Sequence, residues 1–189
     1  MTGSSDRTIG GELDMIIRTA ISRSRRSLSL AEEMNAAGFH TSAFVWAVRS
    51  IEIFVKEVML LPYFFEQTGG DFGASFKKAQ KGLGASSWGR AMKIVNEQYG
   101  PLDPMVTDDG NEVWTEWKAK VVRRRGDFVH GVADAKQAEA ELVITWAEMM
   151  MTQLTLRLIV AKRHPLHDLF VAALISSQAQ KGIQESETR

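Results

Sequence analysis

Apolar residues in this chain recur at the spacing of an α-helix. Within the segment 41–61 they stand four, three, four and three positions apart, at Phe44, Val48, Ile51, Val55 and Val58. This spacing places the five side chains on one face of a helix. A β-strand would need a run of alternating residues enriched in β-branched side chains between turn signals, and no such run is present. The sequence therefore predicts an all-α fold.

Turn-forming residues mark the ends of the first two helices. The first is expected over 12–36, before Gly38 supplies a left-handed cap. The second is expected to begin after Thr41 or Ser42 as its N-cap and to end at Pro62 and the glycine pair that follows. The apolar face of the first helix is predicted to consist of Met15, Ile16, Thr19, Ala20 and Leu28.

The middle of the chain predicts two shorter helices between Asp71 and Tyr99. The sequence GLGASS separates them, with Ser86 or Ser87 as the cap of the second. The strongest break in the chain follows, a loop that runs from Gly100 to Asn111 and contains two prolines and a DDGN turn cluster.

Beyond this loop the sequence predicts one helix rich in tryptophan and one long helix. The first begins near Asn111, ends at Gly131 and carries Trp114, Trp117, Val121 and Phe128 on one stripe. The second is expected over about 135–163, with a short last helix over 166–175. Its core-facing residues are predicted to be Ala138, Leu142, Met149, Leu156 and Val160.

A length of 189 residues fits one domain. We expect residues 12–175 to form a single helical domain, with residues 71–111 as a helical insertion between two main helix pairs. The segments 1–11 and 176–189 are small, polar and without periodicity, so we expect both to be disordered tails.

Composition excludes several classes of protein. The chain has no cysteine, which excludes thiol catalysis, iron–sulfur clusters and thiolate zinc sites. Its 23 basic and 23 acidic residues balance, which argues against nucleic-acid binding through overall positive potential but not through a local basic stripe. No signal peptide is apparent, and the longest apolar run, near Val58–Phe65, is too short to span a membrane. We expect a cytoplasmic protein without a membrane partner.

The segment 121–131, with the sequence VVRRRGDFVHG, contains the strongest candidate for a functional site. Arg125 falls on the stripe that Trp114 and Trp117 define, and a charge on an apolar face is costly without a partner or a function. Glu52, on the polar face of the second helix, is the expected partner. The alternative is that Arg125 serves only structure, through this ion pair or by reaching the solvent.

His130 follows Arg125 by five positions and precedes Gly131. Histidine titrates near neutral pH, as a general acid–base catalyst requires. The alternative is a histidine that only caps the end of its helix.

An arginine followed after four to six residues by histidine and glycine, late in a bundle helix with a long helix beyond, resembles the HEPN superfamily, the higher-eukaryote and prokaryote nucleotide-binding domain. The resemblance covers the helix of residues 41–61 and the region 112–163. It implies an all-α bundle and a metal-independent endoribonuclease of the kind found in toxin–antitoxin and phage-defence systems. It further implies a homodimer, RNA as substrate, and in some members an antitoxin or sensor protein as partner.

On this resemblance Arg125 and His130 form the catalytic pair, with Glu52, Asp127 and Arg124 in supporting positions. Arg123 and Arg124 also satisfy the spacing to His130, so spacing alone does not choose among the three arginines. No metal or other cofactor is required. Lys118, Lys120 and Arg123 would bind RNA phosphates, and Arg23, Arg25 and Arg26 would form a second basic patch. The chain departs from the family pattern at Gly126, where many members have a polar residue such as asparagine.

On an ideal helix Arg125 and His130 project about 140° apart, so one straight helix does not direct both at one phosphate. Two solutions follow. Either Gly126 permits a local distortion, or two copies of the motif meet across a symmetric dimer.

Other readings of the sequence remain open. A non-catalytic helical binding or scaffold module for a protein or nucleotide partner would use the same surface. The pair His167-Asp168, two residues beyond Pro165 and close to His164, resembles the HD phosphohydrolases, although no aspartate follows Asp168. His40, in the turn between the first two helices, is expected to serve capping or to face the solvent.

Overall fold

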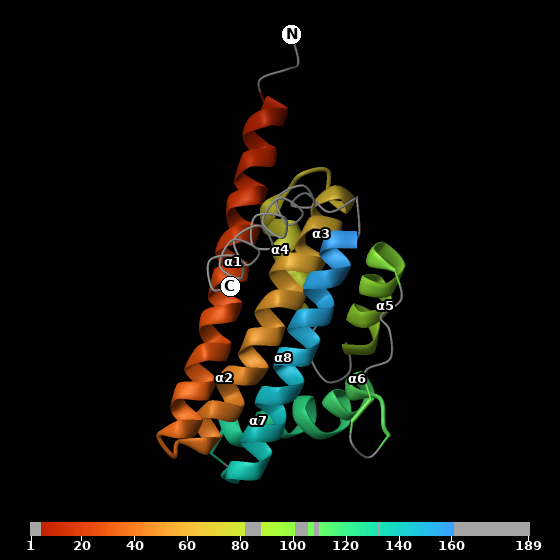
Figure 1. Ribbon diagram of the computed structural model, residues 1–189. Coiled ribbons are helices and arrows are strands. Elements are labelled where there is room, and N and C mark those ends of the chain that lie inside the picture. Colours follow the sequence, from red (N-terminus) through yellow and green to blue (C-terminus); the bar gives the residue numbers. More distant parts are fainter. Residues whose placement is uncertain (1–4, 82–87, 101–105, 108–109, 132, 161–189) are drawn as a thin grey trace, which may run out of the picture.

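The computed structural model describes residues 5–81, 88–100, 106, 107, 110–131 and 133–160, with the side chains of residues 5–10 left aside. These residues form helices and one isolated bridge between Val106 and Glu112, which agrees with the all-α prediction. Three long helical segments run side by side, and the shorter helices lie at their two ends and along one side (Figure 1).

The helix α1 (Ser5–Ala36) packs along α2 (His40–Ile53) through small side chains. The buried positions of α1 include Ala20, Ser24 and Ala31, which face a helix that contributes Ala43 and Ala47. Small residues let two helix backbones approach closely. The buried Ser24 hydroxyl is satisfied because it donates to the carbonyl of Ile21, 2.9 Å away.

Two expectations about α1 need correction, and one is confirmed. Residues 5–11 belong to α1 and not to a disordered tail. Met15 and Thr19 are exposed, whereas Leu13 and Ile17 are buried. The apolar spacing did not identify the buried face, because serine and alanine make up much of it. The left-handed Gly38 is confirmed by its φ of 83°.

Thr41 is not the cap of α2, which begins at His40 without a side-chain cap. Its hydroxyl accepts a hydrogen bond from the backbone N–H of Ala135 at 3.0 Å and so joins the start of α2 to the chain before α8. The ring of His40 is half-buried, and its Nδ1 lies 2.8 Å from Oδ1 of Asn35.

The second helix does not end at Pro62. It continues through a π-helical segment, η1 (Phe54–Leu60), and then as α3 (Leu61–Gln67). The N–H of Leu61 bonds the carbonyl of Lys56, five residues back, as in a π-turn. Pro62 follows this π-turn directly, as the second residue of α3. The five predicted core residues of this helix are all buried.

The insertion holds the two expected short helices, α4 (Phe72–Gln80) and α5 (Trp88–Tyr99). Both contact η1. The buried hydroxyl of Tyr99 donates to the carbonyl of Met59 at 2.7 Å, which fixes α5 against the π-segment. Burial raises the pKa of Tyr99, so this hydroxyl stays protonated. Ser86 and Ser87 lie outside the described residues.

The tryptophan-bearing helix is a continuous helical run made of α6 (Val113–Glu116), the π-helical η3 (Trp117–Val122) and α7 (Arg123–Val129). All four residues of the predicted stripe are buried. Trp114 stacks against Trp88 of α5, and Phe128 meets Phe44 of α2 edge to face with centroids 4.5 Å apart. Gly131 ends the run with a φ of 67°, as predicted.

The long helix α8 (Gln137–Val160) lies along α2 and α1. Its predicted core stripe is wrong: Leu142, Leu156 and Val160 are exposed, and Ala147, Met150 and Leu154 are among the buried residues. By length and composition α8 also meets the criteria for a membrane span, a property that it shares with core helices. The expected end of this helix near residue 163, the helix over 166–175 and the tail over 176–189 lie outside the described residues.

Candidate functional site

Arg125 and Glu52 form the ion pair that the sequence predicts. The Arg125 Nη2 lies 3.2 Å from Oε2 of Glu52, and the side chains are 38% and 6% exposed. α7 brings the guanidinium to α2 because Phe128 anchors the same helix on Phe44. The buried Nε of Arg125 has no hydrogen-bond partner among the described residues. Glu52 thus orients the guanidinium but leaves part of its hydrogen-bonding capacity unused.

Two further cations surround this pair. The Arg49 Nη1 lies 4.0 Å from Oε2 of Glu52, and Lys56 sits one turn further along the same helix. Burial lowers the pKa of Lys56, and the nearby Arg49 and Arg125 lower it further, against the opposing effect of Glu52 and Glu57. We call Arg49, Glu52, Lys56 and Arg125 the α2 charge cluster.

Of the three consecutive arginines, Arg125 alone takes part in the α2 charge cluster. Arg124 forms an ion pair with Glu139 of α8, and its guanidinium carbon lies 4.9 Å from the centroid of Phe128. Glu139 also accepts from the backbone N–H of Lys136 at 2.9 Å, so that Arg124 and Glu139 together tie the end of α7 to the start of α8. Arg123 is exposed.

His130 lies at the C-terminal cap of α7. Its backbone N–H donates to the carbonyl of Gly126 at 3.0 Å, and its side chain is exposed. Asp127 is exposed as well. The imidazole is therefore accessible to a ligand that approaches this end of the bundle.

On an ideal helix Arg125 and His130 project about 140° apart and about 7.5 Å along the axis. α7 is helical through Gly126, and His130 follows it as the C-terminal cap. The local distortion at Gly126, one of the two solutions considered, is absent from α7, and the π-helical widening lies upstream, in η3. The other solution, a composite site of two chains, stays a prediction.

The basic residues expected to bind RNA do not form one stripe. Lys118 approaches α5 at Gly89, whereas Lys120 pairs with Glu116 and lines a cavity with Phe44 and Trp146. Arg23, Arg25 and Arg26 do not form one patch either: Arg23 pairs with Glu57, and Arg25 lines the groove between α1 and α8.

Gly126 has room for a side chain. A Cβ at this position would meet nothing within 4 Å, and glycine destabilises a helix interior by about 0.5–1 kcal/mol relative to alanine. We expect Gly126→Ala to raise the free energy of unfolding by that amount, as measured by urea denaturation. Gly131→Ala, at a φ of 67°, is the matched control and is expected to lower it. A Gly126→Ala chain less stable than the parent would contradict the regular geometry of α7.

Sequence reasoning missed the roles of Arg49 and Lys56. Neither residue was among the predicted site residues, but within the described chain Glu52 pairs with both Arg125 and Arg49. The π-turns that begin at Phe54 change the register of Lys56, and sequence patterns give no signal for them. His164, His167 and Asp168 lie outside the described residues, and no group of three potential metal ligands occurs within them.

No protein-family model matches this chain, no curated protein matches it, and no solved structure matches its fold. The resemblance to the HEPN superfamily stays a prediction from the motif and its helical setting.

Proposed function

We propose that this protein is a metal-independent endoribonuclease of HEPN type, a toxin or phage-defence effector. The observation that carries the proposal is the guanidinium of Arg125, held at 3.2 Å by a buried carboxylate yet partly open to solvent. A positioned guanidinium in a cationic cluster suits the negative charge that develops on a phosphate during transfer.

The reaction would be cleavage of a phosphodiester by the 2′-hydroxyl of the RNA itself. His130 would take the proton of the attacking hydroxyl, and an imidazolium would return a proton to the leaving 5′-oxygen. Arg125 would bind the equatorial oxygens of the phosphorane. The products would be a 2′,3′-cyclic phosphate and a free 5′-hydroxyl, so that atoms and charge balance without water in the first step.

This chemistry needs the two residues on one phosphate, whereas on an ideal helix they project about 140° apart. We therefore propose a homodimer in which Arg125 and His130 of two chains line a shared cleft. Val129, between the motif residues, is 52% exposed, and its burial on association would favour such a contact. An antitoxin or sensor protein could regulate the dimer by covering the same end.

The test is cleavage of RNA by the purified chain in the presence of EDTA. We expect products with 2′,3′-cyclic phosphate ends, and growth arrest when the chain is expressed alone in a bacterial host. Intact RNA and normal growth, from a folded dimeric protein, would contradict the proposal.

A non-catalytic binding module is the second candidate. It is favoured by apolar side chains that remain exposed near the starts of α2 and α8, and these two starts lie at the same end of the bundle (Figure 1). Phe39, Trp46 and Leu142 are 61%, 38% and 43% exposed, which suits a protein partner. Such a module would bind its partner without RNA cleavage and without growth arrest.

A further inference from the structure

A cavity of about 240 Å³ lies between η1 and α4, beside the α2 charge cluster. Arg49, Lys56 and Glu57 line one side of it, and Phe76 and Gln80 of α4 contribute to the other. At about 30 Å³ for each molecule of liquid water, this is room for about eight waters. The cavity thus accepts a small polar group with an attached ring or sugar fragment.

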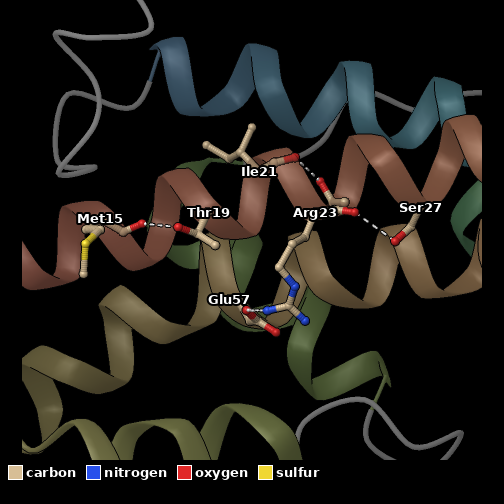
Figure 2. A network of polar contacts seen from close by, with 7 residues as sticks. Met15, Thr19, Ile21, Arg23, Ser27 and Glu57 are labelled. Atoms are coloured by element: carbon tan, nitrogen blue, oxygen red, sulfur yellow. Dashed lines mark hydrogen bonds and ion pairs between the residues drawn. The ribbon is translucent and has the colours of Figure 1, made fainter.

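The acidic group of the cavity is already neutralised from outside it. Arg23 of α1 reaches across to Glu57 of η1, with Nη1 and Oε2 3.1 Å apart (Figure 2). The Glu57 side chain is 12% exposed and the Arg23 side chain is 48% exposed, so the carboxylate is the shielded partner of this pair.

The second carboxylate of the region is likewise engaged. Glu52 lies 3.2 Å from Arg125 and 4.0 Å from Arg49. Lys56 by contrast has neither an ion pair nor a hydrogen bond among the described residues, although its side chain is half-buried. Four cations therefore surround two carboxylates, and the excess positive charge faces the cavity.

Burial of an ammonium group without a partner is costly. The lowered pKa of Lys56 shows that burial and the neighbouring guanidinium groups oppose its charge. A bound anion would remove this cost, because it would attract both Lys56 and Arg49. The flexible ammonium and the fork of a guanidinium are the two groups with which proteins bind phosphate.

We propose that this cavity binds the phosphate group of a nucleotide, either free or within an RNA strand. Lys56 and Arg49 contact the phosphate oxygens, and the ring of Phe76 offers an apolar surface to the sugar or base. The amide of Gln80 can donate to or accept from polar atoms of the ligand. The proposal requires no cleavage, so it does not depend on the endoribonuclease function.

The experiment measures binding by the full chain with His130→Ala, so that RNA is not cut. One arm titrates adenosine 5′-monophosphate by calorimetry, with adenosine as the probe that lacks phosphate. The other titrates a fluorescent single-stranded oligoribonucleotide by anisotropy. Each titration is repeated with two further variants in the His130→Ala background. One carries Lys56→Met, which keeps the apolar stem of the side chain, and the other carries Lys93→Met, the matched control on the exposed face of α5.

We expect Lys56→Met to weaken binding about tenfold, the effect of losing one charged contact, and Lys93→Met to leave it nearly unchanged. Loss in the nucleotide arm identifies a free nucleotide, and loss in the RNA arm alone identifies a strand. Equal affinities of the two variants in both arms, or no binding of either probe, would overturn the proposal. If Lys56→Met does not fold, Arg49→Gln serves in its place, because that side chain is 42% exposed.

Discussion

Replacement of His130 by alanine is expected to lower the rate of RNA cleavage by about 10²–10⁴-fold, the usual contribution of a general acid–base catalyst. The fold should survive, because the His130 side chain is exposed and only its backbone bonds the helix. Single-turnover cleavage in EDTA measures the rate, and circular dichroism the helix content. His40→Ala makes the same change at the turn between α1 and α2 and should keep full activity.

Arg125→Lys provides the complementary variant. Lysine keeps the charge that Glu52 needs but loses the planar fork that matches a phosphorane, so activity should fall while stability changes little.

A mixture of Arg125→Lys and His130→Ala chains forms some dimers in which one chain supplies the arginine and the other the histidine. Partial recovery of cleavage in the mixture is expected if the site is shared. A parental rate of cleavage in His130→Ala would contradict the catalytic pair. No recovery of cleavage in any mixture would contradict the shared cleft.

Trp117→Ala is expected to lower the free energy of unfolding by about 3–5 kcal/mol, the cost of truncating a large core aromatic. Trp117 is 1% exposed and is the largest of the fully buried side chains. It begins η3, so its loss also removes a contact that holds the π-segment on the core. Urea denaturation followed by far-UV circular dichroism, at one fixed protein concentration because a dimer's stability depends on it, measures the change.

Trp46→Ala removes the same side chain from a position on α2 that is 38% exposed. Its cost is expected to stay below about 1 kcal/mol, as for most surface changes. Similar denaturation midpoints for the two variants would show that Trp117 does not carry the packing of this region.

The sequence was sufficient for the two helical runs in which apolar residues recur at helical spacing. The five predicted core residues of the run that begins with α2, and the four of the tryptophan stripe, are all buried. For α8 the same method chose Leu142 and Leu156, which are exposed. This helix carries apolar residues on almost every side, so the spacing alone does not identify the face that meets the core. In α1 the buried face was also missed, because the serines that line it make it look polar in the sequence.

Some features of the candidate site could be predicted from the sequence and others could not. The pairing of Arg125 with Glu52 could be predicted, since a charge on an apolar stripe requires a partner and α2 offered one carboxylate on its polar face. The cavity at Lys56 could not, because it depends on where α4 lies and on the π-turns of η1. Neither has a local sequence signature. The sequence also left two geometries open for Arg125 and His130, and the regular helix at Gly126 removes one of them.

The π-turns of η1 decide how this helix tolerates a change in length. Loss of one residue between Phe54 and Leu60 would let the segment tighten to ordinary α-helical turns. Because a π-turn holds about one residue more than an α-turn, α3 would keep nearly the direction in which it now packs on α4. The same deletion within the regular turns of α2 would rotate all that follows by about 100°.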